Sequence, residues 1–181
     1  MSGLEAGHMD VFDSYSGATV SAAQVRTGSY SLSLGAVNHW ALAALPANIS
    51  EVFGRFAIRA NYTSFYNLGN TLMTLYDSIG GTQITIQLHY YTGLVQVRRG
   101  DHSGTILGIG GELHQNRWHC VEFRLVVDDA AGVFQLKVDG TQVINFAGDT
   151  QATANANVRS FRIGWNDTAH AALGYLSLIH I

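Results

Sequence analysis

The chain has 181 residues, of which 47% are hydrophobic and 13% are charged, with 20 glycines and one proline. This composition excludes a disordered protein, and the length suits one globular domain that covers residues 1–181. The net charge is −3 and the ten Lys and Arg adjoin only at Arg98 and Arg99, so we expect no nucleic-acid partner.

Short apolar runs, separated by clusters of Gly, Asn, Asp and Ser, predict β-strands along the whole chain. The 3.6-residue period of a helix is nearly absent, and we find no internal repeat of about 20 to 50 residues. The pattern therefore predicts an all-β fold, a two-sheet antiparallel β-sandwich (jelly roll). In chain order, the expected strands span residues 30–34, 40–45, 52–60, 71–76, 82–91, 94–99, 120–127, 133–138, 141–146, 158–164 and 174 onward.

The clearest signal is the stretch WHCVEFRLVVDDAAGVFQLKVDG, residues 118–140. Apolar residues from Val121 to Val127 alternate with Glu122 and Arg124, which is the period of a strand with one buried face. Asp139-Gly140 suits the positive φ angles of a type I′ turn, so a hairpin is expected there. The lone Cys120 falls in the alternating pattern and is expected to be a buried small side chain rather than a reactive thiol.

These motifs carry a resemblance to a known superfamily. The second half of the chain resembles the second half of a concanavalin A-like, laminin-G-like jelly roll. The motifs that carry this resemblance are Trp118-His119, the alternating strand, the Asp128-Asp129-x-x-Gly132 turn, the hairpin and Phe161-Arg162-Ile163-Gly164. Residues 26–32 and Phe53-Gly54-Arg55-Phe56 are similar to its first half, so the likeness covers most of the chain. The resemblance implies the fold, but the superfamily includes lectins, glucanases, lyases, adhesion domains and phage structural proteins. The start Asp10-x-Phe12-Asp13-Ser14-Tyr15 is similar to domains of tailed phages and environmental bacteria.

The last residues, 176–181, have a different character. Leu176-Ser177-Leu178-Ile179-His180-Ile181 resembles the peptide that results when a sequencing adapter is translated at the edge of an assembled read. We therefore expect a non-native tail here. The alternative is a genuine apolar closing strand.

The best candidate binding surface is the hairpin of residues 82–99. If Thr92-Gly93 forms a two-residue turn, Tyr91 lies opposite Leu94, His89 opposite Gln96 and Gln87 opposite Arg98. Planar amides, an aromatic ring and an arginine on one sheet face suit sugars, whose hydroxyls and ring faces they bind. The alternative is an ordinary solvated outer face, and in both cases these side chains are expected to be exposed. The expected polar side comprises Gln83, Thr85, Gln87, His89, Tyr91, Gln96 and Arg98.

A second set of aromatic and polar residues could contribute to binding. It comprises His39, Trp40, Tyr62, Phe65, Tyr66, Trp165 and Asn166. Trp118 and Trp165 are more simply explained as core or rim residues.

Metal sites have weak support in the sequence. The eight His show no H-E-x-x-H or comparable ligand spacing. The resemblance implies calcium as a cofactor candidate, since laminin-G-like domains often carry one on loop oxygens. Ordinary turn formation is the favoured alternative for the weak calcium candidates, which are Asp77, Asp101, Asp149 and Asp167.

Catalysis by paired carboxylates is not expected. A retaining glycosidase needs two carboxylates about 5 Å apart, which on one strand means residues two or four apart. Glu122 has only Asp128 on its own face, six residues or about 20 Å away. The predicted function is thus a non-catalytic, lectin-like glycan-binding module. One alternative is a structural virion or fibre-packing module, whose partners would be other virion or surface subunits. The second alternative is a polysaccharide hydrolase or lyase. A lyase would use Tyr91, His89 and Arg98.

The N-terminal segment shows no secretory signal. MSGLEAGHMD has neither the basic start nor the apolar segment of a secretory signal, and no run approaches the roughly 18 apolar residues of a membrane span. We expect no membrane partner. A virion or an extracellular surface is the predicted location, reached as part of a larger particle or polypeptide.

Overall fold

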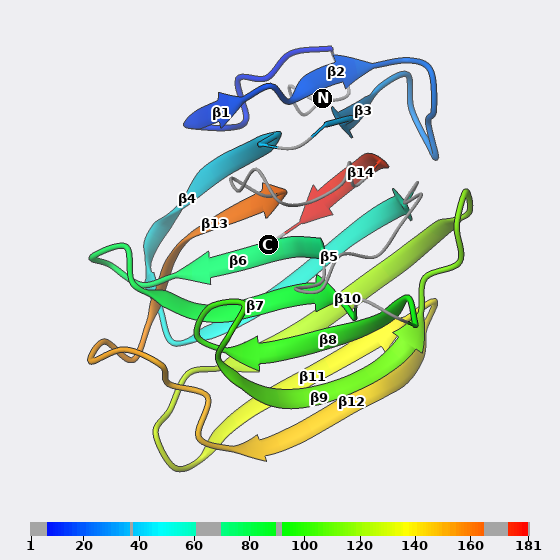
Figure 1. Ribbon diagram of the computed structural model, residues 1–181. Helices are drawn as coiled ribbons and strands as arrows, with labels where there is room; N and C mark the ends of the chain where they lie inside the picture. Colours follow the sequence, from blue (N-terminus) through cyan, green and yellow to red (C-terminus); the bar gives the residue numbers. More distant parts are fainter. Residues whose placement is uncertain (1–6, 37, 61–69, 90–91, 165–173, 181) are drawn as a thin grey trace.

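The computed structural model consists of two antiparallel sheets stacked face to face (Figure 1). The structure describes residues 7–36, 38–60, 70–89, 92–164 and 174–180, the last seven and residue 70 as backbone only. Strands make up all the regular structure of these residues, and none of their segments forms a helix that could span a membrane. The predicted all-β sandwich is confirmed.

Each sheet has seven strands. The first sheet runs in the order β1 (Ser14–Ser16), β4 (Trp40–Ile49), β13 (Val158–Gly164), β6 (Asn70–Tyr76), β7 (Thr82–Leu88), β8 (Leu94–Arg99) and β9 (Thr105–Glu112). The second runs in the order β12 (Thr141–Gly148), β11 (Gly132–Val138), β10 (Trp118–Val126), β5 (Glu51–Ala60), β14 (Gly174–His180), β3 (Ser31–Leu34) and β2 (Thr19–Ser21). The backbone of β14 pairs with β3 and β5, while the non-native origin of residues 176–181 stays a prediction.

Strands β1, β2 and β9 are absent from the sequence prediction. β1 and β2 have three residues each, too few for a periodic signal. β9 contains three glycines, which are depleted in ordinary strands. Here the glycines let β9 approach the second sheet, because a Cβ on Gly108 would lie 2.6 Å from Ile144 Cγ2 and one on Gly110 would lie 2.6 Å from Val143 O.

The core fills the space between the two sheets. Alternating residues of β10 and β11 point into it, as the sequence predicts, and the rings of Phe123 and Phe134 stack with centroids 6.0 Å apart. Gly54, paired with Phe123, leaves room for that ring. Each fully buried large apolar side chain contributes about 1.5–3 kcal/mol to stability.

The hairpin between β11 and β12 turns as predicted. Asp139 has φ 51° and Gly140 has φ 82°, the positive values of a type I′ turn. The Asp139 carboxylate accepts hydrogen bonds from the backbone N–H of Cys120 and from His119 Nδ1, both at 2.7 Å. His119 Nε2 in turn accepts from the backbone N–H of His114 at 3.0 Å, so this histidine has a structural role. Cys120 is buried, as expected.

Gly140 offers a direct test of this turn. Gly140→Ala is expected to lower the free energy of unfolding by about 1–2 kcal/mol, because alanine is strained at positive φ although the space around Gly140 is open. The matched control is Gly35→Ala, at an exposed glycine outside the positive-φ region, which should change stability by less than about 0.5 kcal/mol. Urea unfolding of both variants measures the difference, and equal stabilities would contradict the turn assignment.

Candidate functional site

One face of the first sheet gathers polar side chains from five strands. Ile84, Ile86 and their neighbours point into the core, so the residues between them point to the opposite side. Directly paired residues of antiparallel strands share a face, which extends this assignment across the sheet. The polar face, as we define it, comprises Trp40, Thr71, Thr74, Tyr76, Thr85, Gln87, Gln96, Arg98 and Arg162.

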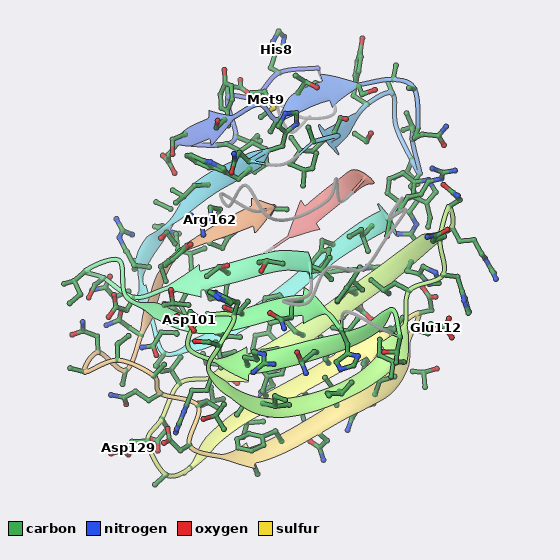
Figure 2. The ribbon with its side chains drawn as sticks, viewed as in Figure 1. His8, Met9, Asp101, Glu112, Asp129 and Arg162 are labelled. Atoms are coloured by element: carbon green, nitrogen blue, oxygen red, sulfur yellow. The ribbon has the colours of Figure 1, made fainter. Side chains whose placement is uncertain are left out.

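The strand register arranges these residues in two rows. In one row Arg162 pairs with Thr74, Thr74 with Thr85 and Thr85 with Arg98. In the other, Thr71 pairs with Gln87 and Gln87 with Gln96. Neighbours within a row lie about 5 Å apart, and the rows lie about 7 Å apart along the strands. Figure 2 labels Arg162 on β13, beside β6.

A hydrogen-bonded chain determines how the two glutamines are oriented. Gln96 Oε1 accepts from Arg98 Nε at 3.2 Å and from Gln87 Nε2 at 2.6 Å. Because an arginine only donates, the Gln96 atom that faces it must be the carbonyl oxygen. Gln87 must then donate through its nitrogen, and its own carbonyl oxygen, Oε1, is left for another partner.

Buried polar atoms without a partner concentrate on the polar face. Within the described ranges, four buried side-chain atoms lack a hydrogen bond, and Thr71 Oγ1, Gln87 Oε1 and Arg162 Nε belong to this face. Thr71 is 0% and Gln87 2% exposed. Leaving such an atom unpaired costs about 1–3 kcal/mol, so three on one face mark it as the candidate site of the described residues.

The electrostatic character of the polar face is cationic. It includes two guanidinium groups, Arg98 and Arg162, and no carboxylate. The Arg162 guanidinium lies over the Tyr76 ring, 5.2 Å from its centroid. Burial lowers the pKa of Arg162 and raises the pKa of Tyr76, so the phenol stays protonated at neutral pH. The face therefore favours an anionic ligand.

The expected exposure of the candidate residues is wrong. Gln83, Thr85, Gln87 and Gln96 are buried, while His89 and Arg98 are half-buried. At the Gln83 end of the hairpin, the reason is that the loop of residues 149–157 folds back over this side. Gln83 Oε1 accepts from the backbone N–H of Ala152 at 2.8 Å, and its Nε2 donates to Thr153 Oγ1 at 3.0 Å. Gln83 thus holds the loop of residues 149–157 and is not available for a ligand.

The predicted turn at Thr92-Gly93 is also corrected. Gln87 pairs with Gln96 rather than with Arg98, and His89 N donates to Leu94 O, so the register is displaced by two residues. A shift of two keeps each side chain on its face, which is why most of the predicted polar set survives. His89 follows β7, and its Nδ1 lies 3.1 Å from Thr92 Oγ1. Tyr91 lies outside the described residues.

The secondary candidates divide into three groups. Trp40 pairs with Gly164, two residues from Arg162, and so joins the polar face from β4. His39 packs against Gly17, where an added Cβ would collide with its ring. The remaining candidates lie outside the described residues: Tyr62, Phe65, Tyr66, Trp165 and Asn166.

The sequence prediction missed Thr71, Thr74, Tyr76 and Arg162. Arg162 alternates with Phe161 and Ile163, which was a readable sign that it points away from the core. No sequence signal places β13 and β6 beside β7. A bulge between Thr71 and Met73 further alters the pairing, so that Thr71 lies opposite Gln87.

The weak calcium candidates have other partners. Asp101 accepts hydrogen bonds from the backbone N–H and hydroxyl of Ser103, and Asp149 forms an ion pair with Arg99. The Asp77 carboxylate is buried and fully hydrogen-bonded, and Asp167 lies outside the described residues. In the part of the chain that the structure describes, no three His, Cys, Asp or Glu gather as metal ligands. Asp128 likewise accepts from the N–H groups of Ala130 and Ala131, as a turn residue does.

Comparison with known proteins identifies the fold. No protein-family profile and no curated protein sequence matches the chain. Among solved structures, the endo-β-1,4-glucuronan lyase of the fungus Trichoderma reesei is similar with a TM-score of 0.72 and 16% identity, over 96% of this chain and 91% of the lyase. The alginate lyase vAL-1 from Chlorella virus gives 0.58 and 9%, over 97% and 94%. The carbohydrate-binding module CBM66 from Bacillus subtilis gives 0.50 and 11%, over 89% and 92%.

These similarities define the class of fold and correct one prediction. The fold is the jelly-roll sandwich shared by carbohydrate-active proteins, as the concanavalin A-like resemblance implies. The prediction that the protein is not an enzyme is wrong as an inference from this fold, because polysaccharide lyases are prominent among the structures that match the chain over most of their length. Paired carboxylates are a requirement of retaining glycosidases and not of lyases, so their absence from the nine residues of the polar face does not bear on a lyase.

Proposed function

We propose that the protein is a polysaccharide lyase that cleaves a uronic-acid polysaccharide by β-elimination. The observation that carries the proposal is the polar face, on which Thr71 Oγ1, Gln87 Oε1 and Arg162 Nε are buried without partners beside two guanidinium groups. The similarity to glucuronan and alginate lyases supports the choice of reaction.

Elimination from a uronate has three requirements. A base removes the proton on C5, next to the carboxylate, while the C4–O bond breaks and a C4–C5 double bond forms. The departing oxygen takes up a proton from solvent or a side chain. Positive charge and hydrogen-bond donors near the carboxylate stabilise the charge that develops on it.

The polar face supplies groups for these requirements. Arg98 and Arg162 hold carboxylates of the polymer through charge-assisted hydrogen bonds. Gln87 Oε1 accepts a hydrogen bond from a sugar hydroxyl, and the Thr71 hydroxyl can donate or accept beside it. His89, which follows the end of β7 next to this row, is the base that removes the C5 proton.

A hydrolytic mechanism is less well supported. Retaining glycosidases need two carboxyl groups about 5 Å apart. The polar face contains none. For the elimination, Tyr76 is not a partner of His89. Tyr76 lies five residues along β6 from Thr71, which pairs with Gln87 at the His89 end of the polar face, so about 17 Å separates the two groups and they cannot act on the same bond.

The proposal is tested by incubating the purified protein with glucuronan, with alginate and with a neutral arabinan. We expect an ultraviolet absorbance from the new C4–C5 double bond with at least one uronate polymer and none with arabinan. Binding without a double bond would contradict the lyase proposal and leave a glycan-binding module. The virion or extracellular setting remains a prediction that this assay does not address.

A further inference from the structure

The outward face of the second sheet presents a row of groups that the polar face does not explain. In register, Phe53 of β5 pairs with Arg124 of β10, Arg124 with Gln135 of β11, and Gln135 with Asn145 of β12. Four adjacent strands span about 14 Å, so an aromatic ring, a guanidinium and two amides follow one another across the sheet. From this arrangement we propose a second binding surface, for an anionic polysaccharide chain.

Exposure distinguishes this row from the polar face. Phe53 is 61% exposed, whereas Gln87 is 2% exposed. The flat apolar face of an exposed aromatic side chain is the group on which sugar rings stack. The Arg124 guanidinium lies over the Phe53 ring, 5.9 Å from the ring centroid.

The row borders an open hollow of about 420 Å³. A neighbouring row contributes to the same hollow, in which Arg55 pairs with Glu122 and Glu122 with Lys137. The hollow is therefore lined by a ring, by planar hydrogen-bonding groups and by charges, which is the chemistry that recognises saccharides.

Charge favours an acidic polymer over a neutral one. The surface includes three cations, Arg55, Arg124 and Lys137, and two carboxylates, Glu51 and Glu122, in a chain whose net charge is −3. Arg124 Nε contacts Glu51 at 2.8 Å and Arg55 Nε lies 3.6 Å from Glu122. Lys137 has no ion pair with any described residue and is the cation most available to a carboxylate of the ligand.

The second surface and the polar face lie on opposite sides of the sandwich. In Figure 1, β5, β10 and β11 lie behind the first sheet, and the core separates the two surfaces. One sugar residue therefore cannot contact both. The choice of an acidic polymer as ligand rests on the proposed function, whereas the existence of the surface does not.

The test is native electrophoresis of the full chain in gels that contain alginate, glucuronan or neutral arabinan. We expect an anionic polymer to retard the wild-type protein. Phe53→Ala should weaken this apparent affinity about fivefold, in line with the ~0.5–1.5 kcal/mol of an aromatic contact. Lys137→Gln should make retardation less sensitive to salt. Ile79→Ala, at an exposed apolar residue of the β6–β7 turn (81% exposed), is the matched control and should behave as wild type.

The outcomes separate this proposal from the proposed function. Equal retardation of wild type and Phe53→Ala, or equal retardation by arabinan with no effect of Lys137→Gln, would overturn it. Lyase activity of Phe53→Ala on a short soluble uronate oligosaccharide should equal that of wild type, because Phe53 is not part of the polar face. If no lyase activity exists at all, the loss of retardation in Phe53→Ala still supports the second surface.

Discussion

His89→Ala is expected to lower kcat/KM on the uronate polymer by at least about 100-fold, the lower end of what a positioned general base contributes. The loss should fall mainly on kcat, because the carboxylates of the polymer remain bound by Arg98 and Arg162. The free energy of unfolding should change by less than about 1 kcal/mol, since His89 is half-buried and directly follows the end of β7. Steady-state assays by double-bond absorbance measure the effect.

A matched histidine variant serves as the control for this result. His8 is exposed and lies at the far end of the molecule from β7 (Figure 2). His8→Ala should therefore keep the wild-type rate. If His89→Ala also keeps it while Gln87→Ala loses activity, the polar face is the site but His89 is not its base. If both keep it, the site lies elsewhere.

Asp77→Ala is expected to lower the free energy of unfolding by about 3 kcal/mol, the upper range for a buried hydrogen-bonding group whose partners are left unsatisfied. Asp77 Oδ1 accepts from the N–H groups of Ile79 and Gly81 at 3.0 and 2.6 Å. Its Oδ2 accepts from Thr153 Oγ1 at 2.7 Å and Asn155 Nδ2 at 2.9 Å. One carboxylate thus joins the β6–β7 turn to the loop of residues 149–157, and urea unfolding measures its contribution.

The contribution of Asp77 depends on pH in a defined direction. Burial by itself would raise the pKa of Asp77, but the four hydrogen bonds to its carboxylate hold that pKa below the ordinary value. A carboxylate whose pKa is lower in the folded state stabilises the fold above the unfolded pKa of about 3.9 and loses that effect as the pH falls through the folded value. The difference between wild type and Asp77→Ala should therefore be full at pH 7 and shrink below about pH 4.

A control separates this structural role from calcium binding. Asp101→Ala removes an exposed loop carboxylate and should cost less than about 1 kcal/mol. A chelator should leave the Tm of the wild-type protein unchanged. A chelator-dependent Tm that disappears in Asp77→Ala would show that Asp77 is a calcium ligand and contradict the structural assignment.

The polar face illustrates what the alternation of residues along a strand can predict. The alternation in residues 82–99 predicts that Thr85, Gln87, Gln96 and Arg98 share one side, and the structure confirms this although the register differs by two residues. Alternation depends only on the geometry of an extended backbone, so it survives errors in turn length. It does not report whether that side is covered, since loops distant in sequence decide burial.

Most of the strands, the Asp139-Gly140 turn and the burial of Cys120 are readable from residue order, because each depends on neighbours a few positions apart. The meeting of Arg162 from β13, Thr71 from β6 and Gln87 from β7 is decided by strand order, which brings together residues up to 91 positions apart. The exposure of Phe53 on one sheet and the burial of Gln87 on the other are likewise tertiary properties. Both residues belong to alternating strands, but Phe53 is exposed to solvent while Gln87 is buried with its carbonyl oxygen unpaired. The packing of segments that are distant in sequence determines which of these side chains contacts water.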